Sequence, residues 1–126
     1  MNPLLTGKRN YLLIQLFVIA GYVAAALLGF QFASINDNVT LIWIPAGLAL
    51  AVILNFGCSY WPAIFIGATI ANHLAGSGGI TAFGIAVGNT AEALIACWII
   101  NAIFKTRINN FTHPKQVAGL IFAAAC

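Results

Sequence analysis

Four long apolar runs, separated by short polar breaks, account for most of this chain of 126 residues. Charged residues make up only 6% of the sequence, whereas a soluble domain has about 25%. So few charged residues cannot coat a globule of this size, and lipid must therefore cover much of the surface. The first apolar run, residues 11–32, is longer than the apolar core of about 7–15 residues in a cleaved signal peptide. We therefore expect an integral membrane protein that keeps its first helix.

The apolar runs predict an all-α fold, a polytopic bundle of transmembrane helices. The predicted helices cover residues 11–32, 41–56, 61–74 and 80–104. A further apolar run starts at residue 117 and stops at residue 126, which is too short for a bilayer that takes about 20 helical residues to cross. We interpret this run as the start of a fifth helix. On that interpretation the sequence is the amino-terminal part of a longer protein.

Basic residues indicate how the helices are oriented. Lys8 and Arg9 precede the first apolar run, and Lys105, Arg107 and Lys115 follow the fourth. If four helices span the membrane, all five basic residues lie on one side, and an excess of Lys and Arg marks the cytoplasmic side. We therefore expect an inner-membrane protein with a cytoplasmic amino terminus. The basic residues form no cluster long enough to indicate nucleic-acid binding.

Small residues recur at four-residue intervals and predict close helix packing, because helices in lipid associate through close backbone approach. Gly67 belongs to such a stripe in the third predicted helix, and Gly84 and Gly88 form a G-x-x-x-G pattern in the fourth. That pattern fits packing within the chain or a homodimer interface, and packing within the chain is favoured because four helices need partners. The stripes comprise Gly21, Ala25 and Gly29; Ala63, Gly67, Ala71 and Ala75; and Gly84, Gly88, Glu92 and Ala96.

Glu92 is the most informative polar residue. It lies about twelve residues into the fourth predicted helix, near the middle of the membrane at a rise of about 1.5 Å per residue. An ionised carboxylate there costs about 2.5–3.5 kcal/mol, so we expect Glu92 to face the interior of the bundle. Asn89 is one turn away on the same helix. Asn72 and His73 of the third predicted helix lie at a similar depth, so a polar cluster of these four residues is geometrically possible.

Two interpretations of this polar cluster are open. Its residues either form a ligand, ion or proton site that takes part in signalling, or form hydrogen bonds between helices worth about 1 kcal/mol each. The cost of an intramembrane carboxylate favours function for Glu92. The structural interpretation is slightly favoured for Asn72 and Asn89. For His73, a solvated or headgroup-facing position at the interface is favoured.

The sequence contains no motif for a catalytic site, a nucleotide loop or a metal site, so we expect no enzyme, no cofactor and no metal. Its three cysteines, Cys58, Cys97 and Cys126, are isolated in the sequence and are interpreted as small packing residues. Pro45, near the start of the second predicted helix, either forms a hinge or, more often for a proline at this position, shapes the first turns.

Three blocks of sequence resemble one family of bacterial membrane domains. Residues 43–51 read WIPAGLALA. Residues 57–72 include the glycine and the YWP motif of the turn, followed by phenylalanine, glycine and alanine-asparagine at helical spacing. Residues 88–94 read GNTAEAL. In this order they resemble the second, third and fourth helices of membrane-associated sensor domains (the MASE family, first type). The turn at residues 57–60 departs from that family, because Cys58 and Ser59 stand where a basic residue is common.

The resemblance implies an integral membrane sensor that precedes a cytoplasmic output module, such as a histidine kinase or a diguanylate cyclase. The expected function is therefore a sensory input module, and its expected partners are the lipid bilayer, the remaining helices and the output domain. A homodimer is a further possibility. The alternative function is a component of a small-molecule transporter, in which Glu92 is a coupling or substrate residue.

The predicted orientation is tested by a reporter fused after Lys115. We expect this fusion to be active as a cytoplasmic reporter, because the basic residues on both sides of the four apolar runs favour the same compartment. A periplasmic signal from the same fusion contradicts the orientation.

Overall fold

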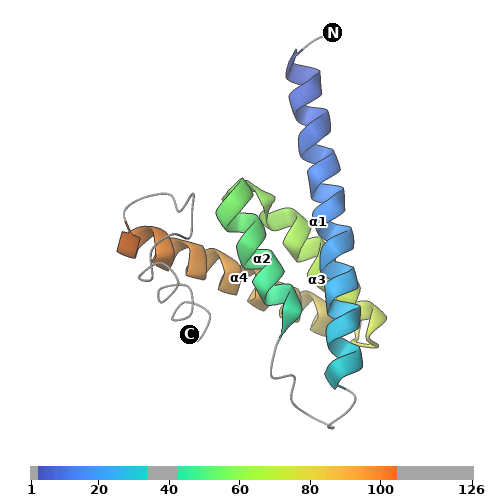
Figure 1. Ribbon diagram of the computed structural model, residues 1–126. Coiled ribbons are helices and arrows are strands. Elements are labelled where there is room, and N and C mark those ends of the chain that lie inside the picture. Colours follow the sequence, from blue (N-terminus) through green and yellow to red (C-terminus); the bar gives the residue numbers. More distant parts are fainter. Residues whose placement is uncertain (1–2, 34–42, 105–126) are drawn as a thin grey trace.

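The computed structural model describes residues 3–33 and 43–104 (Figure 1). These residues form four α-helices: α1 (Pro3–Ala33), α2 (Ile44–Phe56), α3 (Trp61–Leu74) and α4 (Gly79–Phe104). A short 3-10 turn, η1 (Cys58–Tyr60), joins α2 to α3. The described residues contain no strand, which confirms the all-α fold. The fifth helix expected from residue 117 lies outside the described residues.

Two of the described helices are long and apolar enough to cross a membrane. They contain the candidate spans Gly7–Gln31 and Gly79–Ile100. By contrast, α2 has 13 residues and α3 has 14. At about 1.5 Å per residue, each is about 20 Å long, which is less than the bilayer's hydrocarbon core of about 30 Å. Length and composition thus support spans in α1 and α4, and the crossing of the membrane by α2 and α3 stays a prediction.

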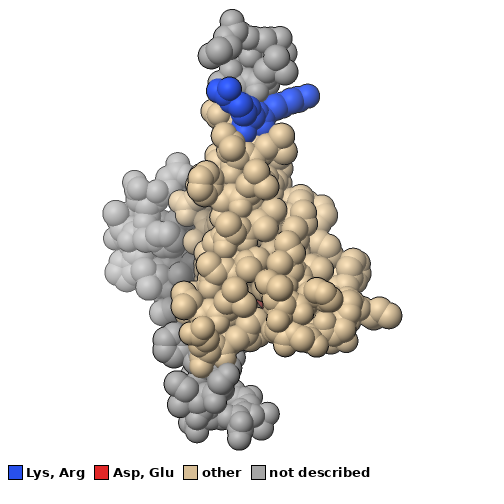
Figure 2. All heavy atoms as spheres, turned by 90° about the vertical axis from the view of Figure 1, so that its right-hand side faces the viewer, with Lys and Arg blue, Asp and Glu red and all other residues tan. Residues whose placement is uncertain are grey.

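The helix boundaries follow local chemistry more closely than hydropathy. Helix α1 begins at Pro3 instead of residue 11, because the apolar run marks only the part of a helix that suits lipid. Lys8 and Arg9 extend from this end of α1, and the face seen in Figure 2 is largely uncharged over the rest of the described surface. Helix α2 begins at Ile44 with the buried Pro45 in its first turn, where its missing N–H is not needed. This position supports the interpretation that Pro45 shapes the start of α2.

Two glycines adopt backbone conformations that other residues rarely adopt. Gly57 ends α2 with φ 98°, and its N–H donates to the carbonyl of Ile53 at 2.9 Å. Gly76 has φ 91° and lies between α3 and α4. Because glycine adopts positive φ angles without steric cost, Gly57 and Gly76 allow short connections at both ends of α3.

Helix α3 is the central element of the described fold. It packs extensively against both α1 and α4, while α2 packs against α1 and α4. Figure 1 shows α4 crossing at a steep inclination to α1. The largest fully buried side chains include Tyr22 of α1, Ile53 of α2 and Ile64 of α3.

Gly67, in the predicted packing stripe on α3, lies at a close contact between two helices. A Cβ added to Gly67 would lie only 2.9 Å from the Cβ of Tyr22, so α1 and α3 approach each other too closely there for a larger residue. In the predicted stripe on α1, Ala25 is buried, Gly21 faces Leu48 and Gly29 faces Trp43.

On α4, the predicted stripe packs at Ala96, which is buried with Leu50 of α2, but not at its two glycines. Gly84 and Gly88 are exposed, and no atom lies within 4 Å of a Cβ added to either residue. The packed face of α4 is a second set of mostly small residues, which we call the buried stripe. The sequence places small residues on two faces of α4, and spacing alone does not show which face meets α3. The buried stripe comprises Ala82, Ala86, Thr90, Ala93, Cys97 and Ile100.

The contact between α1 and α3 is tested by the variant Gly67→Ala. We expect a loss of about 1–3 kcal/mol in the free energy of unfolding, because the added methyl group collides with the Cβ of Tyr22. Thermal unfolding of the purified protein in detergent measures this change.

Gly47→Ala is the matched control, since a Cβ at this α2 position meets no atom of the described residues within 4 Å. We expect this control to be neutral or slightly stabilising, because alanine favours helix. Equal stability of the Gly67→Ala variant and the parent protein contradicts the close approach.

Candidate functional site

The hydroxyl of Tyr22 is a polar centre inside the described fold. Tyr22 is fully buried, and Asn89 of α4 donates from Nδ2 to the Tyr22 hydroxyl at 3.1 Å. The side chain of Trp43, just before α2, also hydrogen-bonds to this hydroxyl, and Glu92 interacts with it electrostatically. We call Tyr22, Trp43 and Asn89 the Tyr22 cluster. It joins α1, α4 and the start of α2.

Hydrogen-bond chemistry orients the Tyr22 cluster. The amide Nδ2 of Asn89 and the indole N–H of Trp43 are donors, so the Tyr22 oxygen accepts from both. A phenolic oxygen has two lone pairs and one proton, so this arrangement leaves its O–H to donate. Glu92, three residues after Asn89, is the one carboxylate among residues 3–33 and 43–104. The cluster thus combines a phenol, an amide and an indole, and the carboxyl group of Glu92 lies outside it on α4.

The sequence led us to expect that Glu92 faces the interior of the bundle. In the described helices it does not. Its side chain is exposed, whereas Thr90 and Ala93 on either side of it are buried. The reason is its helical position. Glu92 is one turn beyond Gly88, on the side of α4 where no described atom approaches Gly84 or Gly88. Asn89 lies between the two faces, is half-buried, and reaches Tyr22.

Asn72 and His73 do not join the Tyr22 cluster by hydrogen bonds. Asn72 is buried, but its Nδ2 donates to the carbonyl of Ala68 on its own helix at 2.8 Å. The main-chain carbonyl of Asn72 accepts from the N–H of Ser77 at 3.1 Å and so closes the turn after α3. His73 is exposed in the last turn of α3. No hydrogen bond between described residues connects Asn72 or His73 to Asn89 or Glu92, so hydrogen bonds do not join the four residues in the described structure.

Sequence reasoning missed the role of Tyr22. The available signal was its position, because Tyr22 places a hydroxyl in the middle of an otherwise strongly apolar run. Buried tyrosine hydroxyls usually find a hydrogen-bond partner, so the position implied one on another helix. The partner itself was not identifiable, because it depends on how α4 is placed against α1.

A second polar contact holds the amino-terminal half of α1. The hydroxyl of Tyr11 donates to the carbonyl of Ser59 in η1 at 2.7 Å and accepts from Nε2 of Gln15 at 2.6 Å. The rings of Tyr11 and Tyr60 also pack with centroids 5.0 Å apart. Helix α1 is therefore attached at two levels, at η1 and at the Tyr22 cluster.

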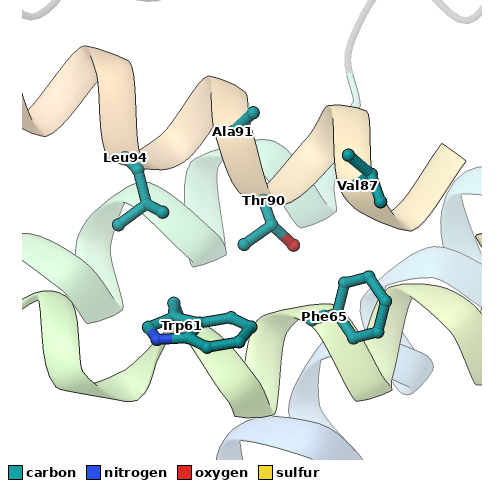
Figure 3. A pocket seen from close by; sticks show the side chains of 6 residues that line it. All are labelled: Trp61, Phe65, Val87, Thr90, Ala91 and Leu94. Atoms are coloured by element: carbon teal, nitrogen blue, oxygen red, sulfur yellow. The ribbon is translucent and has the colours of Figure 1, made fainter. Parts of the chain in front are cut away.

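An apolar groove opens between α3 and α4. It has a volume of about 340 Å³, and in Figure 3 Trp61 and Phe65 of α3 face side chains of α4 across it. The hydroxyl of Thr90 donates to the carbonyl of Ala86 at 2.7 Å, so it is satisfied within its own helix. The groove therefore suits an apolar chain better than a polar ligand. Its lining comprises Trp61, Phe65, Val87, Thr90, Ala91 and Leu94.

The described residues contain no group of three or more His, Cys, Asp or Glu side chains that could hold a metal ion. They do bring together two cysteines that are isolated in the sequence. Sγ of Cys58 lies 3.8 Å from Sγ of Cys97, although 39 positions separate them. The interpretation of both residues as packing residues alone is therefore incomplete.

Comparison with known proteins identifies the domain that contains this site. The MASE1 family profile matches residues 12–126, which include most of α1 and all of α2, α3 and α4. The chain belongs to the MASE1 family. MASE1 domains are membrane sensory domains typical of signalling proteins. No curated protein and no solved structure matches the chain. The Tyr22 cluster thus lies within a MASE1 domain.

The hydrogen bond between Tyr22 and Asn89 is tested by a double-mutant cycle with Tyr22→Phe and Asn89→Ala. We expect a coupling of about 0.6 kcal/mol, with an upper range of about 1.7 kcal/mol, because hydrogen bonds between helices in membranes fall in this range. Reversible unfolding of the purified protein in detergent measures the four stabilities.

Asn55→Ala replaces Asn89→Ala in the control cycle. Asn55 donates from Nδ2 to the carbonyl of Ala51 on its own helix, and no hydrogen bond between described residues joins it to α1, so we expect no coupling with Tyr22→Phe. Strictly additive effects of Tyr22→Phe and Asn89→Ala rule out a contribution of the hydrogen bond to stability.

Proposed function

We propose that this MASE1 chain is the sensory input part of a bacterial signal-transduction protein, and that it acts through a change in helix packing and not through catalysis. The observation that carries the proposal is the family match over residues 12–126. The proposed location is the inner membrane, with the amino terminus in the cytoplasm. The placement of Lys8 and Arg9 at one end of α1, away from the apolar part of the helix, supports this orientation. The proposed output module is a histidine kinase or a diguanylate cyclase.

The proposed switch is the position of α4 relative to α1. Their polar contact is the hydrogen bond from Asn89 to Tyr22, and α3 packs against both helices. A stimulus changes the populations of two packings only if it favours one of them. A shift of α4 along α3 separates Asn89 from Tyr22, so the two packings differ in whether this bond is formed. The proposed signal is therefore gain or loss of the contact between Asn89 and Tyr22.

Glu92 is proposed to couple this switch to the rest of the receptor. It interacts electrostatically with Tyr22 but remains exposed on the outer face of α4, beside Gly84 and Gly88. Exposure of an ionised carboxylate to lipid costs about 2.5–3.5 kcal/mol, so a protein partner stabilises Glu92. We propose that further helices of the full-length receptor cover this face, since glycines allow a close approach there. A homodimer through the same face is the second arrangement to test.

The role of Glu92 is tested by Glu92→Gln in the full-length receptor. We expect basal output to change by about fivefold, because an interaction of about 1 kcal/mol shifts a two-state equilibrium by that factor. Kinase or cyclase activity in isolated membranes, at matched receptor abundance, is the measurement.

Asp37→Asn is the matched control, because it changes the other carboxylate of these 126 residues to its amide. We expect the control to retain the output of the parent receptor. Unchanged basal output and an unchanged stimulus response in Glu92→Gln remove Glu92 from the mechanism.

A further inference from the structure

Two cysteines from distant parts of the chain meet at the turn between α2 and α3. Cys58 is the first residue of η1 and is exposed. Cys97 belongs to the buried stripe of α4. Their sulfur atoms lie 3.8 Å apart. Packing on both sides maintains this approach, because Cys97 shares one core cluster with Tyr60 of η1 and Ile53 of α2.

The geometry is close to that of a disulfide without being one. A disulfide joins its sulfurs at about 2.05 Å, so Sγ of Cys58 and Sγ of Cys97 need to approach by about 1.8 Å. Cys58 lies in a short turn and not within a long helix, so side-chain rotation and a small backbone adjustment of η1 can supply this movement. Cys58 is an exposed residue that a reagent can reach, and the buried Cys97 is next to it.

We propose that Cys58 and Cys97 are a redox-responsive thiol pair that a small-molecule disulfide converts into an intrachain disulfide. The thiolate of Cys58 attacks one sulfur of the reagent, forms a mixed disulfide and releases one equivalent of small thiol. The thiolate of Cys97 then attacks the sulfur of Cys58 and releases the second small thiol. The protein loses two thiol protons and two electrons, and the reagent gains both. Reduction by a dithiol reverses the reaction.

Burial assigns the two roles. Cys58 is the attacking residue because it is exposed, and Cys97 is the resolving residue because it is buried beside Cys58. The bond would tie α4 to η1, whose Ser59 carbonyl accepts the hydrogen bond from Tyr11 of α1. Cys97 is two turns from Asn89 on α4, so the same bond would restrain the helix that carries the Asn89–Tyr22 contact. The inference goes beyond the proposed sensory function, and its chemical test does not depend on that function.

The test is a mapping of disulfides in native membranes that contain the protein. The membranes are treated with oxidised glutathione, remaining thiols are alkylated with iodoacetamide, and the digested protein is analysed by mass spectrometry. We expect a peptide pair joined through Cys58 and Cys97 that disappears after treatment with dithiothreitol. Cys126→Ser is the matched control, because it changes the third cysteine of the chain, and it should give the same cross-linked pair.

Two further variants test the order of the steps. In Cys97→Ser, we expect the reaction to stop at a glutathione adduct on Cys58, present at about ten times its level in the parent protein, because the intramolecular step is missing. In Cys58→Ser, we expect Cys97 to stay unmodified. A glutathione adduct on Cys58 of the parent protein without the cross-link, a cross-link from Cys58 to Cys126, or no reaction at Cys58 overturns the proposal.

Discussion

The close approach of α3 to Tyr22 is the constraint on which the rest of the described structure depends. Residue 67 has no room for a Cβ, because an added one would lie 2.9 Å from the Cβ of Tyr22. In lipid, where burial of apolar surface does not drive helices together, such a contact gains its stability from dispersion over closely packed atoms. The same contact places the Tyr22 hydroxyl within reach of Asn89. A glycine on one helix thus positions a polar interaction between two others.

Helix α4 has two faces with different roles. The buried stripe packs against the described helices through mostly small side chains and one satisfied threonine. The outer face presents Gly84, Gly88 and Glu92, with no described atom close to the glycines. A helix packed tightly on one face and uncovered on the other suits the proposed sensor, because further receptor helices can bias its position. Asn89 lies at the boundary between the two faces and links them through Tyr22.

The turn at residues 57–60 joins α2 to α3 and also contacts α1 and α4. Gly57 supplies the left-handed conformation, Cys58 meets Cys97 of α4, and the Ser59 carbonyl accepts from Tyr11 of α1. Tyr60 packs against rings from both α1 and α2. A four-residue connection therefore touches all the neighbouring helices, so a chemical change at Cys58 would act where α1 and α4 are both anchored.

The sequence by itself determined the helical class, the family and most helix boundaries, because apolar runs, prolines and glycines act locally along the chain. The prediction of residues 61–74 for the third helix matches α3, and the end predicted for the second helix matches α2. Only the tertiary structure decided which face of α4 is packed, because small residues at four-residue spacing occur on two of its faces. It likewise decided that Asn89 pairs with Tyr22 and not with Asn72, and that Cys58 meets Cys97. These pairings depend on the rotation and displacement of one helix against another, and no spacing within a single helix encodes either quantity.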